Sequence, residues 1–165
     1  MRLKYVLPAV RALLDSERDP RLKDLSPEDW EWLRAGYQRD VALVAPTRRA
    51  GIEFLAGTDA ITDFCLPGFS LHDELALLVQ AGLTPMEALQ AATTNPARFL
   101  GRERDLGTVE GGKLADLIVL DADPLADIRH TTRIHAVVAD GRLLDRTTLD
   151  RMLVHVETAV KDQGP

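Results

Sequence analysis

The segment AGTDA ends a short apolar run with two polar side chains, Thr58 and Asp59. The run GIEFLAG has the length and composition of a buried strand, so we expect a strand over residues 52–58. A carboxylate at the end of such a strand can bind a metal ion or accept a proton from an attacking water molecule. The alternative is a structural role, in which Asp59 caps the following turn through backbone N–H groups. The sequence makes Asp59 the first candidate for a catalytic residue and metal ligand.

A second candidate, His72, lies in the first turn of a helix predicted for SLHDELALLVQAG. Ser70 is the expected cap of that helix, and Asp73 is its expected reciprocal partner. The positive end of a helix disfavours a charged imidazole, so we expect His72 to be neutral and available as a ligand or hydrogen-bond acceptor. An exposed first-turn histidine without a function is the alternative.

A nucleophilic mechanism is the weakest hypothesis that the residue types allow. Cys65 or Ser70 could attack an ester, with His72 as base and Asp63 or Asp73 to orient it. The spacing gives no support to Cys65, and GFSLH lacks the second glycine of a strand-turn-helix nucleophile elbow. The remaining histidines, His130, His135 and His155, match no zinc-binding spacing and are expected at the surface.

Helix signals position these residues. Ser26, Pro27 and Asp29 predict the start of a helix that Pro46 should kink or end. Its predicted buried face is formed by apolar side chains three or four residues apart, namely Trp30, Leu33, Tyr37, Val41 and Val44. The segment TPMEALQAAT predicts a further helix that begins in the same way, with Thr84, Pro85 and Glu87 as its start signals, and NPARFLG predicts another.

From about residue 106 the pattern changes to short strands. Residues 117–120 form an apolar run, and Asp140-Gly141 predicts a tight hairpin between two strands. A final helix follows, with a predicted apolar face of Leu149, Met152, Leu153, Val156 and Val160.

The bulk composition limits the function classes. The chain has 165 residues and a net charge of -6, which does not favour binding to nucleic acid or to an anionic membrane. No apolar stretch approaches the ~20 residues of a membrane helix, and no signal-peptide cleavage pattern follows the first residues. Cys65 is the only cysteine, so no internal disulfide is possible and we expect a cytoplasmic protein.

Four motifs in order resemble the C-terminal part of the metal-dependent amidohydrolases, in particular the imidazolonepropionase-like and prolidase-like members. The motifs are GIEFLAGTDA, LPGFSLHDELALLVQAGLTPMEALQAATTNPARFLG, LGTVEGGKLADLIVLDADPLADI and IHAVVADGRLL. The resemblance implies that AGTDA ends the last strand of a (β/α)8 barrel. It implies that Asp59 binds metal and takes a proton from the attacking water, and that His72 lies near the mouth of the site.

The departures from the family pattern are equally specific. A complete barrel takes about 250 residues, and the family's His-x-His pair, bridging lysine and two further histidine ligands have no match in this sequence. We therefore expect the chain to correspond to the last third of such an enzyme, beginning at a methionine internal to it. An unpaired barrel strand leaves backbone groups without partners, so we expect a homo-oligomer or a partner chain that completes the barrel.

The predicted fold class is α/β. A partial (β/α)8 barrel segment with helices around strand 52–58 is expected over residues 1–105, and a small β-sandwich remnant with a C-terminal helix over residues 106–165. The predicted function is hydrolysis of carbon–nitrogen (amide or cyclic amide) or ester bonds of a small molecule by metal-activated water, with zinc as the expected ion. The alternative is an inactive module that folds or oligomerises without turnover and binds no metal; a serine or cysteine esterase is the third.

Overall fold

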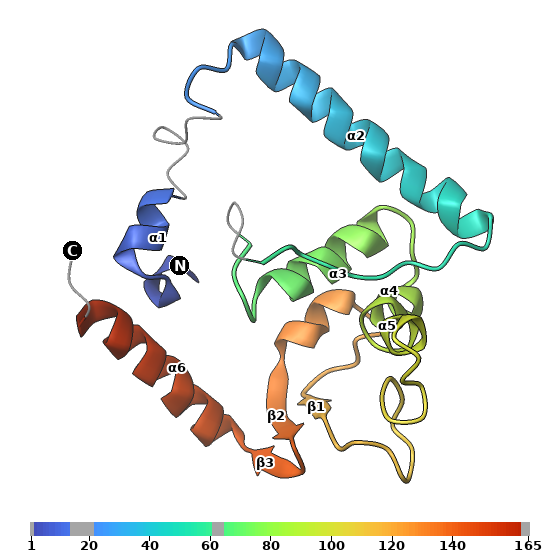
Figure 1. Cartoon of the computed structure of the whole chain (residues 1–165), viewed down its shortest axis with the longest axis vertical. Helices are drawn as coiled ribbons and strands as arrows, with labels where there is room; N and C mark the ends of the chain where they lie inside the picture. The colour runs from blue at the N-terminus through green and yellow to red at the C-terminus, as the bar shows by residue number, and fades with distance from the viewer. Residues whose placement is uncertain (1, 14–21, 61–64, 163–165) are drawn as a thin grey trace.

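The structure, a computed structural model, describes residues 2–13, 22–60 and 65–162 (Figure 1). Asp63 lies outside the described residues. The elements are, in chain order, η1 (Arg2–Tyr5), α1 (Pro8–Leu13), α2 (Pro27–Arg49), α3 (Ser70–Gln80), α4 (Pro85–Ala92), α5 (Thr94–Phe99), β1 (Leu117–Leu120), η2 (Ile128–Thr132), β2 (Ile134–Ala139), β3 (Arg142–Leu144) and α6 (Arg146–Asp162).

The core of the described structure lies where α3, α4 and η2 meet. Leu75, Ala88 and Ile128 form a buried cluster, one from each of these elements. Ala56 and Leu78 pack against it, so the extended segment before α3 also contributes. The core is small, and none of the described helices is both long and apolar enough to cross a membrane.

The predicted small β unit is confirmed as a three-stranded antiparallel sheet in the order β1-β2-β3. Asp140 and Gly141, at φ 51° and 71°, form the predicted tight turn between β2 and β3. Positive φ at both central positions matches the twist of a two-residue hairpin, and Asp and Gly tolerate it.

Two capping predictions are confirmed. At α2 and at α4, Ser26 and Thr84 accept a hydrogen bond from the backbone N–H three residues on, and the Asp29 and Glu87 carboxylates accept from the cap N–H in return. The prediction for Ser70 is wrong. Phe69 is the cap residue of α3, because the Ser70 hydroxyl turns back and accepts a hydrogen bond from Leu66 N–H at 2.7 Å.

The expected strand over residues 52–58 is not a paired strand. The segment is extended between α2 and α3, but no other strand lies beside it in the part of the chain that the structure describes. A strand is defined by ladder hydrogen bonds to a neighbour. Here the backbone is held by hydrogen bonds with α4 and α5 instead.

The predicted buried face of α2 is also wrong. None of its residues is buried, and Tyr37 is 51% exposed. Figure 1 shows α2 standing apart from α3 along most of its length. It also continues beyond Pro46 to Arg49, so the proline does not end it, although Pro46 lacks the N–H that would donate to the carbonyl four residues earlier.

Candidate functional site

Asp59 lies at the end of an extended segment that α4 and α5 hold in place through two hydrogen bonds. Ala56 N–H donates to the carbonyl of Ala91 on α4 at 2.8 Å. The amide of Asn95 on α5 donates to the Phe54 carbonyl at 3.0 Å. These bonds replace the strand ladder and fix the direction in which the segment arrives at Asp59.

The backbone at Asp59 turns sharply. Its φ is 48°, in the left-handed region, which Asp and Asn occupy more readily than other residues with a side chain. The residue is exposed. The predicted position at the end of an apolar run is therefore found, in an exposed turn.

His72 is half-buried and contacts η2. Its Nδ1 lies 3.0 Å from the Thr131 hydroxyl, and that hydroxyl lies 2.9 Å from the Ile128 carbonyl. A carbonyl only accepts, so Thr131 donates its single proton to Ile128 and accepts from His72. This network assigns the neutral imidazole proton to Nδ1 and leaves the lone pair on Nε2.

Burial lowers the pKa of His72 below its ordinary value. Desolvation is the largest cause, nearby Asp73 acts in the opposite direction, and Arg2 lowers the pKa further. The neutral state predicted from the sequence therefore has support, although the main cause is burial against η2 rather than the helix dipole.

The two predicted site residues lie on different sides of α3. Gly57 N–H points to the Glu74 carboxylate at 3.4 Å, so the Glu74 side of α3 faces the segment that leads to Asp59. His72 precedes Glu74 by two positions, so the two side chains leave the helix about 200° apart around its axis. His72 lines a pocket on the other side, and Asp59 is not among the residues that line it.

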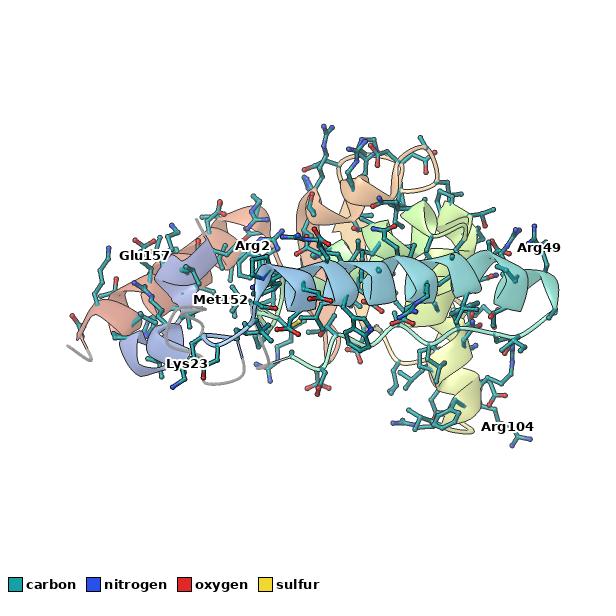
Figure 2. All side chains as sticks on the ribbon, turned by 90° about the horizontal axis from the view of Figure 1, so that it is seen from above. Arg2, Lys23, Arg49, Arg104, Met152 and Glu157 are labelled. Carbon is teal, nitrogen blue, oxygen red and sulfur yellow. The ribbon has the colours of Figure 1, made fainter. Side chains whose placement is uncertain are left out.

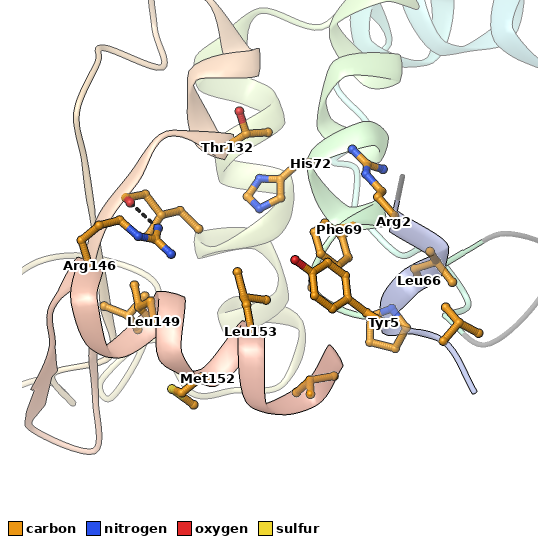
Figure 3. A pocket seen from close by; sticks show the side chains of 16 residues that line it. Arg2, Tyr5, Leu66, Phe69, His72, Thr132, Arg146, Leu149, Met152 and Leu153 are labelled. Atoms are coloured by element: carbon orange, nitrogen blue, oxygen red, sulfur yellow. Dashed lines mark hydrogen bonds between the residues drawn. The ribbon is translucent and has the colours of Figure 1, made fainter. Parts of the chain in front are cut away.

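That pocket has a volume of about 840 Å³ and lies between η1, the start of α3, β2 and α6. Figure 3 shows the His72 ring pointing into it from α3, opposite Leu153 and beside Tyr5 and Phe69. Most of its lining is apolar; from α6 come the residues Leu149, Met152, Leu153 and Val156. Most of the apolar face predicted for α6 thus lines this pocket, and Val160 is the one buried residue of this helix.

Both arginines at the pocket are paired with carboxylates. Arg2 forms an ion pair with Asp73, the residue that the sequence suggested as the reciprocal cap of α3. Arg146 pairs with Asp150 at 2.8 Å and also donates to the Ile134 carbonyl at 2.8 Å. Figure 2 shows Arg2, Met152 and Glu157 together at one end of the molecule, far from Arg49 and Arg104.

The nucleophile hypothesis gains no support from the geometry. The Ser70 hydroxyl is buried and already accepts from Leu66 N–H, while Nδ1 of His72 is engaged with Thr131. Cys65 is a free, half-buried thiol.

Metal ligands do not converge within the described residues. No group of three or more His, Cys, Asp or Glu side chains is placed to hold an ion there. His135 pairs with Asp121 at 2.8 Å, Nδ1 of His130 lies 2.8 Å from the Asp123 carbonyl oxygen, and His155 is exposed. A catalytic zinc usually takes three protein ligands, so the described residues of one chain do not fit a complete metal site.

Two residues near His72 were not found from the sequence. Thr131 lies 59 positions from His72, and Arg2 lies 71 positions from its partner Asp73. No local pattern joins residues so far apart.

Comparison with known proteins identifies relatives over much of the chain. A model described as "Amidohydrolase family" matches residues 37–144. Adenine deaminase 2 of Agrobacterium fabrum is 38% identical over 104 residues, which covers 63% of this chain and 16% of that protein. Imidazolonepropionase of Shouchella clausii is 30% identical over 113 residues, with coverages of 59% and 24%.

Solved structures also align with most of this chain. Bottromycin amidohydrolase aligns with a TM-score of 0.78 at 26% identity and covers 96% of this chain and 35% of its own. A Xaa-Pro dipeptidase with bound methionine in its active site aligns with a TM-score of 0.62 at 28% identity, with coverages of 84% and 34%. The chain thus spans a quarter or less of the two curated relatives and about a third of the two solved chains.

Proposed function

Since the chain belongs to the amidohydrolase family, we propose that it supplies the carboxylate that accepts a proton during hydrolysis of a small-molecule substrate. The bond cleaved is a carbon–nitrogen bond, in an amide or a cyclic amide, or an ester bond. Asp59 takes a proton from the water molecule that attacks the carbonyl carbon. The family membership of the segment around Asp59 supports this class of reaction.

The observation that carries the proposal is the placement of Asp59. It ends the extended segment that α4 and α5 hold through Ala91 and Asn95, within the range matched by the family model. A general base must be held at a defined position relative to the water that it deprotonates. Fixed backbone on the N-terminal side of Asp59 meets that need.

His72 stays a predicted assisting residue. Its side chain leaves α3 on the side away from the segment of Asp59, so the proposal does not depend on it. The division of the chain into a barrel part, residues 1–105, and a sheet part, residues 106–165, is likewise proposed from the resemblance.

Amidohydrolases generally use divalent metal ions, and zinc is the ion that the resemblance implies. The described residues provide no three-ligand group for it. We therefore assign to this chain only Asp59 as a ligand. The other ligands would come from a second copy of the chain in a homo-oligomer, or from a partner chain that completes the barrel.

Exposed apolar side chains support such an assembly. Trp32 and Leu43 on α2 are 67% and 62% exposed, and residues 52–58 have no strand beside them in the described structure. The exposed apolar area and the missing neighbouring strand both favour association with another chain.

The second candidate is an inactive module that folds or oligomerises without turnover. The lack of a three-ligand group among the described residues favours it. Such a protein would bind no stoichiometric metal and hydrolyse no substrate.

The test combines metal analysis with one pair of variants. Asp59 and Asp140 are the two residues other than glycine at positive φ in the described structure, so Asn should be accommodated at both. The purified protein, with and without added zinc, is assayed against N-acyl dipeptides, cyclic amides and aryl esters. We expect Asp59→Asn to lower kcat at least about 100-fold, as loss of a general base does, and Asp140→Asn to leave it unchanged.

Full activity in Asp59→Asn would overturn the assigned role. Absence of both bound metal and turnover would instead support the inactive module. Analytical ultracentrifugation of the same samples determines whether activity requires association.

A further inference from the structure

The pocket between η1, α3, β2 and α6 has features of a small-molecule site that is separate from Asp59. Its volume of about 840 Å³ lies within the range of ligand pockets. Most of the lining is aliphatic or aromatic, and Tyr5 and Phe69 stack with their ring centroids 5.5 Å apart and an interplanar angle of 15°. Met152 adds a polarisable thioether, which favours contact with an aromatic ring.

The imidazole of His72 provides a directed polar group in this apolar space. Thr131 accepts from Nδ1 because its own proton goes to the Ile128 carbonyl, so Nε2 carries the lone pair. The ring lines the pocket, and Figure 3 shows it directed at the space between α6 and the Tyr5 ring. A ligand therefore meets a hydrogen-bond acceptor at His72.

The charges around the pocket disfavour an anionic ligand. Arg2 is paired with Asp73, and Arg146 is paired with Asp150 and bonded to the Ile134 carbonyl. An anion would have to displace these carboxylates to gain a charged partner. A neutral ligand needs no such exchange.

We propose that this pocket binds a neutral, mainly apolar aromatic molecule that donates one hydrogen bond, from a hydroxyl or an N–H group, to Nε2 of His72. The stacked pair of Tyr5 and Phe69 and the apolar face of α6 surround the ring of the ligand. The inference does not rest on the hydrolase function, because the pocket and Asp59 lie on different sides of α3.

The test uses two probes of equal shape, 4-ethylphenol and 4-ethyltoluene, in which a methyl group replaces the hydroxyl. The affinity of each is measured by NMR titration of the whole chain and of His72→Phe, which keeps a ring but removes the acceptor. In each protein, the affinity for 4-ethylphenol is divided by the affinity for 4-ethyltoluene. Comparing this ratio between the two proteins cancels the difference in hydrophobicity between the probes. One neutral hydrogen bond predicts that the ratio falls roughly 3- to 10-fold in His72→Phe.

His130→Phe is the matched control, because His130 is bonded to the Asp123 carbonyl oxygen and does not line the pocket. It should leave the ratio unchanged. Thr131→Val keeps the imidazole but removes the hydroxyl that accepts from Nδ1. Because that hydroxyl is what keeps the lone pair on Nε2, its loss should also lower the ratio.

The unsubstituted protein gives an independent readout. A long-range ¹H–¹⁵N spectrum of the histidine side chains should show the His72 proton on Nδ1, and 4-ethylphenol should shift the Nε2 signal. A proton on Nε2, an unchanged ratio in both His72→Phe and Thr131→Val, or no binding of either probe to residues of the pocket would overturn the proposal.

Discussion

The Thr131 hydroxyl accepts a hydrogen bond from Nδ1 of His72 across 3.0 Å, and it links the first turn of α3 to η2. Together with the buried contact between Leu75 and Ile128, it fixes η2 against α3. The imidazole is neutral in this arrangement. Protonation would place a charge in a half-buried position beside the apolar pocket.

This arrangement predicts a pH dependence of stability. The pKa of His72 is lowered in the folded state, mainly by burial, so the unfolded chain binds the proton first as the pH falls. The free energy of unfolding should be highest above about pH 6.5 and should decrease as the pH falls from there towards the lowered pKa. Urea unfolding of the whole chain and of His72→Phe at about pH 5 and pH 7.5 measures this, and the variant should show the smaller difference. His155 is exposed, and its change to Phe serves as the control. The same stability difference between the two pH values in all three proteins would contradict the prediction.

A second prediction concerns Gly107, where the loop after α5 passes closely over that helix. Its φ is 94°, and a Cβ there would lie 2.9 Å from Ala97 Cβ and 3.1 Å from Thr94 Cα. Gly112, at φ 92°, has nothing within 4 Å of such an atom. Gly112→Ala should cost about 1–2 kcal/mol of stability from the backbone alone, and Gly107→Ala about 1–3 kcal/mol more from the collision. Equal losses in urea unfolding would show that the close approach is absent.

The third prediction compares two capping boxes of the same design. Thr84→Ala should lower the free energy of unfolding by about 1 kcal/mol, because α4 contributes Ala88 and Ala91 to the buried residues. Ser26→Ala should reduce the helical signal in circular dichroism but change the urea midpoint less, since α2 contains no buried residue. A larger midpoint shift for Ser26→Ala would mean that α2 is packed in solution, as in an assembly with another chain.

The fourth prediction concerns Glu157, which joins α6 to η1. Its carboxylate contacts Lys161 at 2.8 Å and Lys4 at 2.6 Å, and these two partners lower its pKa to about 2. Its contribution to stability should be present above the ordinary pKa near 4.5 and disappear as the pH falls through about 2.

Glu157→Gln should therefore lower the melting temperature at neutral pH, less so in high salt, because salt screens exposed ion pairs. Asp150→Asn is a suitable comparison. It removes an ion pair within α6 to Arg146 and leaves η1 untouched. The prediction fails if Glu157→Gln melts like the unsubstituted protein at low salt.

Local chemistry explains which elements the sequence predicted. The capping boxes at Ser26 and Thr84 and the turn at Asp140-Gly141 involve groups within four residues of one another. Their geometry depends little on the rest of the chain. The four motifs from residue 51 onward also identified the family, which the family model over residues 37–144 confirms.

Long-range packing explains the failures. Ser70 has the spacing of a cap, yet its hydroxyl turns back to Leu66, and Asp73 pairs with Arg2 instead of capping. The apolar stripe of α2 satisfies the helical period but meets no partner in the described structure, because periodicity specifies a face and not what covers it. For the candidate site, the end position of Asp59 was predictable from its own segment, whereas the contact of His72 with Thr131 was not.

The attachment of α2 at one end has a consequence for hydrogen exchange. Its contacts with the body lie near its C-terminus, where Ala45 packs beside Gly82 and Arg48 pairs with Glu87. With 23 residues, α2 is the longest of the described helices, yet none of its residues is buried, and helices in proteins owe most of their stability to tertiary packing. In a single copy in D₂O, the amides of its first turns should take up deuterium through local fraying, long before those of the shorter α3 and α4.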